Sequence, residues 1–307
     1  MEDKEEKTLI IQPKQELEEN YYRFFGEETN KDLSFIHSVF AQVALPYKSI
    51  PKNQRDYIKR NGVVSLAVSS GLLEDPITGE LTLQSLPFGV KPRLLLIDIF
   101  SSAVKNRSKK VELEETISEM LKRLGVTPGY GKRGSVSEFH RQMKALIASK
   151  LTIGANFEDQ AITAYPQPFK FVSLWYDKKD RQRSLFDNYV IISDDFYDSL
   201  INHSLPLDLR IIRQLQNSAR CLDLYTYLTY RVCRIDPYDP SSVFLSWEVL
   251  QAQFSNTPGS LSSFKQKFTH DLKRVIKLYT VLIRPEYSGI RLFYSPPSVK
   301  KIEKSIR

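Results

Sequence analysis

The clearest chemical signature lies in one basic segment, residues 262–279. Its apolar side chains recur at four-residue steps, as on one face of a helix: Phe264, Phe268, Leu272 and Ile276. The other face carries charged and polar side chains, namely Lys265, Gln266, Lys267, Thr269, His270, Lys273, Arg274 and Lys277. The only acid in the segment is Asp271. A helix with such a face fits the major groove of duplex DNA, where lysine donates to guanine and glutamine pairs with adenine.

The position of each side chain along this helix suggests its role. Residues near the start of a recognition helix reach base edges. We therefore expect Lys265, Gln266, Thr269 and His270 to contact bases. Residues further along or on the flanks meet phosphates, and we expect this of Lys267, Lys273, Arg274 and Lys277. Ser260 and Ser262 precede the helix, and one of them is expected to cap it beside N–H groups that can hold a phosphate.

A second segment, residues 137–150, has the same design with fewer cations. Its stripe is Phe139, Met143, Ile147 and Leu151, and its polar residues are His140, Arg141, Gln142, Lys144 and Lys150. Ser135 and Ser137 are its candidate caps. Two apolar runs, 169–176 and 185–192, then predict a hairpin whose tip we expect to contact phosphates through Lys178, Lys179, Arg181 and Arg183.

These two helices belong to an internal repeat. Gly134-Ser-Val-Ser-Glu-Phe139 matches Gly259-Ser-Leu-Ser-Ser-Phe264 at an offset of 125, and Ile117, Met120 and Leu124 match Trp247, Leu250 and Phe254 at an offset of 130. Each half is expected to contain three helices and a hairpin. The helices are predicted over 94–106, 112–124 and 137–150, then 208–234, 246–254 and 262–279, and the second hairpin over 281–294.

Three helices and a hairpin are typical of a winged helix, a variant of the helix-turn-helix. The sequence therefore predicts an α+β, mainly helical chain with two tandem winged-helix domains, residues 33–192 and 193–299. Strands are also expected over 63–68 and 80–84. An acidic leader, residues 1–32, and a basic tail, residues 300–307, would flank the domains.

Composition supports a polyanionic partner. The chain has 44 Lys and Arg against 36 Asp and Glu, a net charge of +8. Residues 1–32 hold ten acids and five bases, so the remaining residues carry +13. Two cysteines twelve residues apart, without a CxxC motif, disfavour structural zinc and favour a reducing cytoplasm. No apolar run is long enough to cross a membrane.

Catalytic sites are not apparent in this sequence. The four histidines are scattered, so neither a metal pair for a nicking enzyme nor the His/Arg pairing of a tyrosine recombinase is present. Residues 125–133 have the wrong spacing for a phosphate-binding loop. We therefore expect no enzyme activity and no cofactor.

Several short motifs, in order, resemble plasmid replication initiators of the theta-type RepA family. They are Val43-Ala-Leu-Pro46, Leu86-Pro-Phe-Gly89, Lys91-Pro-Arg-Leu-Leu95, Met120-Leu-Lys-Arg-Leu-Gly125, Gln142-Met143, Leu205-Pro-Leu-Asp-Leu-Arg210, Leu222-Asp-Leu-Tyr225, Leu228-Thr-Tyr-Arg231, Leu245-Ser-Trp247, Gln253-Phe254 and Pro296-Pro-Ser-Val299. One departure is Ser255, where the family usually has glycine, which leaves the tightness of that turn open.

The resemblance implies binding to repeated duplex sites, called iterons, in a bacterial plasmid origin. It also implies a balance between monomers and homodimers, repression of the chain's own gene, and host partners, namely a replication initiator and a helicase. Three alternatives stay open: a tandem winged-helix transcriptional regulator, a DNA-processing enzyme such as a relaxase, and a basic scaffold protein.

Overall fold

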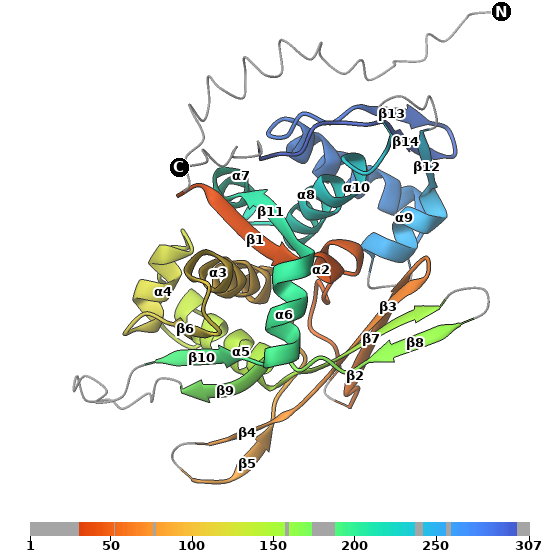
Figure 1. The fold of residues 1–307 in the computed structure, drawn as a ribbon. Coiled ribbons are helices and arrows are strands. Elements are labelled where there is room, and N and C mark those ends of the chain that lie inside the picture. Colours follow the sequence, from red (N-terminus) through yellow and green to blue (C-terminus); the bar gives the residue numbers. More distant parts are fainter. Residues whose placement is uncertain are drawn as a thin grey trace, which may run out of the picture.

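A computed structural model describes residues 31–51, 53–75, 78–156, 160–173, 188–236, 242–255 and 259–299 (Figure 1). Helices and several small sheets are mixed along the chain, and 41% of these residues are helical. The expectation of a mainly helical chain therefore overstated the helix content. The predicted leader (apart from residues 31 and 32), the predicted basic tail and the first hairpin tip lie outside the described residues.

The first half contains three helices around a small sheet. The elements are α3 (Val90–Asn106), β6 (Lys110–Glu112), α4 (Ile117–Arg123), α5 (Ser135–Ala148), β9 (Phe169–Ser173) and β10 (Tyr189–Ile192). The strands are antiparallel in the order β6-β10-β9. Strands β9 and β10 pair with each other, so the part of the predicted hairpin furthest from its tip is present.

The second half repeats this order of elements, without the two strands, residues 150–156 and 161–164, that separate α5 from β9 in the first half. It contains α8 (Ala219–Val232), β12 (Val243–Ser246), α9 (Trp247–Phe254), α10 (Leu261–Ile276), β13 (Ile283–Glu286) and β14 (Gly289–Leu292). Its strands are arranged as β12-β14-β13, so the strand that precedes the short helix pairs with the last strand in both halves. Phe139 and Met143 are buried in α5, as Phe264 and Phe268 are in α10.

Two helices predicted from sequence differ from the structure. The helix expected over 112–124 begins only at Ile117, because Thr116 and Glu119 form a capping box and the residues before them include strand β6. The helix expected over 208–234 is divided into α7 (Leu209–Leu215) and α8. Asp208 and Ser218 each accept a backbone N–H bond at the start of one of these helices.

Further elements surround the two halves (Figure 1). Strand β1 (Leu33–His37) pairs with β11 (Ser204–Asp208), and α2 (Ser38–Gln42) and α6 (Asp194–His203) lie beside them. A four-stranded antiparallel sheet is built from β2 (Asp56–Asn61), β3 (Val64–Ser69), β7 (Lys150–Asn156) and β8 (Ala161–Ala164). The short strands β4 (Leu72–Glu74) and β5 (Leu81–Leu83) form a hairpin of their own. The strands expected over 63–68 and 80–84 match β3 and β5.

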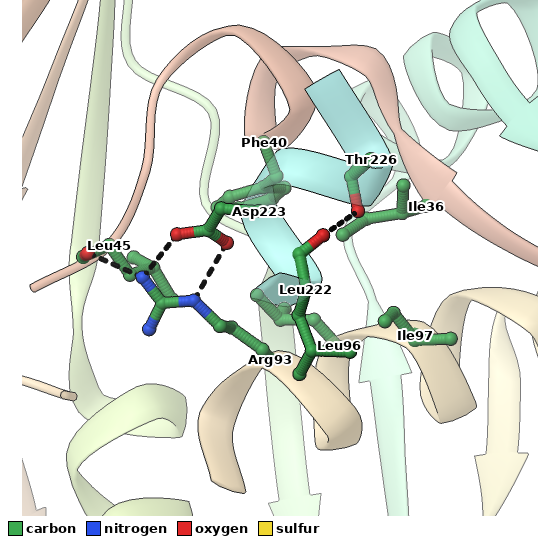
Figure 2. A pocket seen from close by; sticks show the side chains of 9 residues that line it. All are labelled: Ile36, Phe40, Leu45, Arg93, Leu96, Ile97, Leu222, Asp223 and Thr226. Atoms are coloured by element: carbon green, nitrogen blue, oxygen red, sulfur yellow. Dashed lines mark hydrogen bonds and ion pairs between the residues drawn. The ribbon is translucent and has the colours of Figure 1, made fainter. Parts of the chain in front are cut away.

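A buried ion pair connects the halves through their first helices (Figure 2). Arg93 of α3 donates from Nε and Nη2 to the two carboxylate oxygens of Asp223 in α8, over 2.8 and 2.7 Å. Its other N–H groups reach the carbonyl oxygens of Leu45, Gly89 and Pro46 over 2.6, 2.6 and 3.2 Å. All five donors of the guanidinium are therefore satisfied. Burial alone lowers the pKa of Arg93, but Asp223 outweighs this and raises it above its usual value.

A second link joins the four-stranded sheet to the end of α9. Lys59 of β2 donates from Nζ to the carbonyl oxygen of Ser255 over 2.5 Å. Ser255 follows α9 with φ −122°, an extended conformation that does not require glycine. Serine at this position is therefore compatible with the end of the helix.

In the part of the chain that the structure describes, no helix is both long and apolar enough to span a membrane.

Candidate nucleic-acid interface

Helix α10 is fixed at its start and along its inner face. The hydroxyl of Ser260 accepts a bond from the backbone N–H of Ser263, so the predicted cap is present. Phe264, Phe268 and Leu272 are buried, as the periodicity predicted. Val275 is buried as well, whereas Ile276 is only half-buried, because four residues advance a straight helix by slightly more than a full turn and successive four-residue steps drift around the helix.

The single acid of α10 faces inward, which leaves the outer face of the helix basic. Asp271 is buried, and Arg220 of α8 donates to its carboxylate from Nε over 2.6 Å. The other candidate side chains are exposed or half-buried: Ser260, Ser262, Lys265, Gln266, Lys267, Thr269, His270, Lys273, Arg274 and Lys277. This face therefore presents cations and hydrogen-bond donors without a carboxylate from the helix itself.

The β13–β14 hairpin lies against the first turn of α9. Trp247 donates from its backbone N–H to the carbonyl oxygen of Ser288 over 3.0 Å and from Nε1 to that of Tyr287 over 3.1 Å. The ammonium of Lys265 lies 5.5 Å from the ring centroid of Trp247 and 5.9 Å from that of Tyr287. The first turn of α10 and the hairpin tip thus form one surface.

The hairpin strands add less positive charge than their arginines suggest. Arg291 donates to Glu286 over 2.5 Å, and Arg284 reaches the same carboxylate over 3.3 Å. The hydrogen bond from Arg291 lowers the pKa of Glu286, so the carboxylate stays ionised and offsets one of the two cations.

The start of α5 differs from the expectation. Its cap is Gly134, which makes no side-chain bond, so a serine cap was the wrong prediction. Ser135 instead donates to the carbonyl oxygen of Thr127 over 2.9 Å and accepts the N–H of Gly129 over 2.6 Å. Ser137 donates to the carbonyl oxygen of Gly131 over 2.8 Å. Both hydroxyls hold the preceding loop in place.

The outer face of α5 is narrower and less basic than that of α10. Arg141 is exposed, while His140 and Lys144 are half-buried and Gln142 is buried, where it accepts the N–H of Phe88 over 2.7 Å. Lys150, expected in this helix, belongs to strand β7. The hairpin-tip candidates Lys178, Lys179, Arg181 and Arg183 lie outside the described residues.

Two residues that the structure brings out had no functional role predicted from the sequence. Tyr287 lies within the predicted second hairpin, and Arg93 lies within one of the motifs quoted for the family resemblance. The sequence signal available for Tyr287 was an aromatic residue at a tight turn, where a side chain is expected to be exposed. Arg93 donates hydrogen bonds to one residue in each of three other quoted motifs, namely Leu45, Gly89 and Asp223. Within the described ranges, no group of three or more His, Cys, Asp or Glu side chains could hold a metal ion.

Comparison with known proteins gives one family match. The model of a family described as "Plasmid encoded RepA protein" matches residues 86–249, more than half of the chain. The match begins just before α3 and ends within α9, so α10 lies beyond it. No curated protein matches. A similar solved structure, "Crystal structure of the RctB domains 2-3", has 11% identity and a TM-score of 0.48, and the alignment covers 83% of this chain and 94% of that one.

Proposed function

Because the chain belongs to the family of plasmid-encoded RepA proteins, we propose that it initiates plasmid replication by binding repeated duplex sites in the plasmid origin. The observation that carries the DNA-binding part of this proposal is the outer face of α10. Its one acid is turned inward and paired with Arg220, while the cations face solvent. Such a surface attracts phosphates and releases their counterions.

The proposed binding modules are two winged helices, within residues 33–192 and 193–299. The repeated order of helix, strand, two helices and hairpin supports this, as do the matching strand orders β6-β10-β9 and β12-β14-β13. In this arrangement the third helix of each module enters the major groove, and the hairpin lies beside it.

The second module is proposed to read sequence. Gln266, Thr269 and His270 would meet base edges, with Lys265 beside them, and Lys267, Lys273, Arg274 and Lys277 would meet phosphates. The first module would add phosphate contacts from Arg141 and Lys144, with Ser135 and Ser137 ordering the loop before α5. His140 and the tip residues Lys178, Lys179, Arg181 and Arg183 complete the proposed contacts.

The proposal extends to partners and mode of action. The protein would act without a catalytic step of its own, by loading host factors, a replication initiator and a helicase, at the bound origin. It would exist as monomers that initiate and homodimers that repress. The family membership supports these partners, and each can be tested with purified components.

Footprinting on the DNA that flanks the chain's own gene tests the central claim. We expect regularly spaced protected repeats, and loss of protection when Lys267 and Arg274 are both replaced by alanine. Lys48→Ala, which removes an exposed cation outside both modules' third helices, is the matched control and should leave the footprint intact. An irregular or absent footprint with the wild-type protein would refute origin binding.

One observation favours a second candidate, a transcriptional regulator with a small effector. A hollow of about 450 Å³ lies between α6 and the four-stranded sheet, and its lining includes His37, Ile153, Ser199 and His203. That volume is within the range of small-molecule sites. Maintenance of a plasmid that carries only the flanking DNA, when the protein is supplied from elsewhere, would favour the initiator over the regulator.

A further inference from the structure

Tyr287 occupies the tip of the β13–β14 hairpin, and its side chain is 96% exposed. Strand β13 ends at Glu286 and β14 begins at Gly289, so only Tyr287 and Ser288 form the turn. Singly exposed hydrophobic side chains are common on protein surfaces, so it is the surroundings of this ring that point to a partner.

The turn is held rigid from below. Trp247, itself buried, donates one hydrogen bond to the carbonyl oxygen of Tyr287 and another to that of Ser288. Because the backbone is already fixed, binding through the Tyr287 ring orders only two side-chain torsions. The entropic cost of using this ring is therefore small.

The tip is also slender. Ser288 is small, and Gly289 has no side chain because a Cβ there would lie 2.1 Å from the carbonyl oxygen of Leu245. The minor groove of B-DNA is about 6 Å wide, which admits a single ring on a narrow turn but not a broad loop. The shape of the tip thus suits a groove and not a flat surface.

Charge around the ring favours nucleic acid over protein. The ammonium of Lys265 lies 5.9 Å from the ring centroid, and Lys265 belongs to the basic face of α10. Two acidic side chains lie near this surface, and both already have partners. Glu286 is paired with Arg291 and Arg284, and Glu248, at the start of α9, is bonded at the helix N-terminus and lies near Lys265.

We propose that Tyr287 stacks on a nucleobase beside the groove that α10 enters, next to the base contact of Lys265. This inference rests on the proposed function and assigns a contact outside the recognition helix. Aromatic side chains inserted at a base step unstack it, and stacking on a base contributes about 1–3 kcal/mol. Tyr287 would therefore be a contact that opens one base step next to each bound site.

The test uses a duplex that the full-length wild-type protein enriches from a randomised pool, with 2-aminopurine placed at successive positions. We expect a fluorescence change at one position beside the α10 footprint. Tyr287→Ala should abolish this signal and weaken binding roughly 5- to 150-fold, the range that corresponds to the stacking energy. Tyr287→Phe should keep both, because it retains the ring that stacks.

Tyr165→Ala is the matched control. Tyr165 is 73% exposed on a segment without charged side chains, so its loss should change neither reading. Circular dichroism should show that the Tyr287 variants keep the wild-type melting curve, as expected for a side chain in solvent. If wild-type protein binds but Tyr287→Ala gives the same affinity and fluorescence, the inference alone is wrong. If the wild-type protein enriches no duplex, the proposed function fails and the inference fails with it.

Discussion

Replacement of Asp223 by alanine should destabilise the protein strongly, because Asp223 balances a guanidinium that is sealed from water. The side chain of Arg93 is only 4% exposed, and two of its N–H donors end on the Asp223 carboxylate. Each unsatisfied buried donor costs about 1–3 kcal/mol, and removing one partner of a buried ion pair costs about 3–5 kcal/mol. The two donors together give about 2–6 kcal/mol, which agrees with the second figure of about 3–5 kcal/mol, and such a loss is a large part of the roughly 5–15 kcal/mol that stabilises a folded protein.

Urea unfolding followed by circular dichroism measures this loss. Asp223→Ala, Arg93→Met and the double variant that carries both substitutions complete a double-mutant cycle with the wild type. The double variant still leaves the carbonyl oxygens of Leu45 and Gly89 without their donor, so it should remain less stable than the wild type. It should nevertheless lose at least about 2 kcal/mol less than the sum of the two single variants, since no charge is left unpaired.

A surface ion pair serves as the control. Lys109 and Asp194 approach within 2.6 Å, but their side chains are 41% and 60% exposed. Asp194→Ala should therefore cost far less than Asp223→Ala, because solvent screens an exposed ion pair. The reasoning is refuted if Asp223→Ala costs as little as the control, or if the two single losses simply add.

Three further predictions concern DNA binding and pH. Lys267→Ala and Arg274→Ala should each weaken binding to all duplexes and lower the slope of log K against log salt by about 1, as measured by fluorescence anisotropy at several salt concentrations; unchanged slopes would contradict phosphate contacts. Gln266→Ala should chiefly relax sequence preference, by about 1–3 kcal/mol at one base pair, and equal loss on every sequence would contradict a base contact. Burial and the nearby charge of His203 lower the pKa of His37 to about 4, so unfolding, which restores a pKa near 6.5, takes up a proton between these values. The contribution of His37 to the free energy of unfolding should be complete above pH 6.5, and up to about 3 kcal/mol of it should be lost as the pH drops to 4. His37→Gln should flatten this pH dependence in urea titrations.

Local signals in the sequence were sufficient for α9, α10 and the last hairpin. The stripe from Phe264 to Leu272 predicted the inner face of α10, and Ser260 was one of the two expected caps at its start. The turn at Tyr287 and Ser288 followed from two short apolar runs around a glycine. These features depend on residues within one or two turns of each other, which periodicity and capping describe well.

Pairing between distant segments could not be predicted in the same way. Strand β3 pairs with β7, which follows it by more than eighty residues, and nothing in either segment identifies the other. Strand β6 was not predicted, and its last residue, Glu112, was expected to begin a helix, because three residues are too few to show alternation and the partner strand β10 lies far along the chain. Burial of a charged residue is likewise invisible in a helical pattern, which is why Arg93 and Asp223 were not distinguished from ordinary surface charges.

The division of α10 into two faces has a consequence for how such a protein can diverge. Every side chain that holds the helix in place, including Asp271, points inward, whereas the positions from Gln266 to Lys273 that face outward make no packing demand on the rest of the chain. The outward positions are therefore free to vary without loss of the scaffold. A descendant could acquire a new target sequence through a few outward substitutions and cease to recognise its ancestor's sites, while both proteins keep the same core.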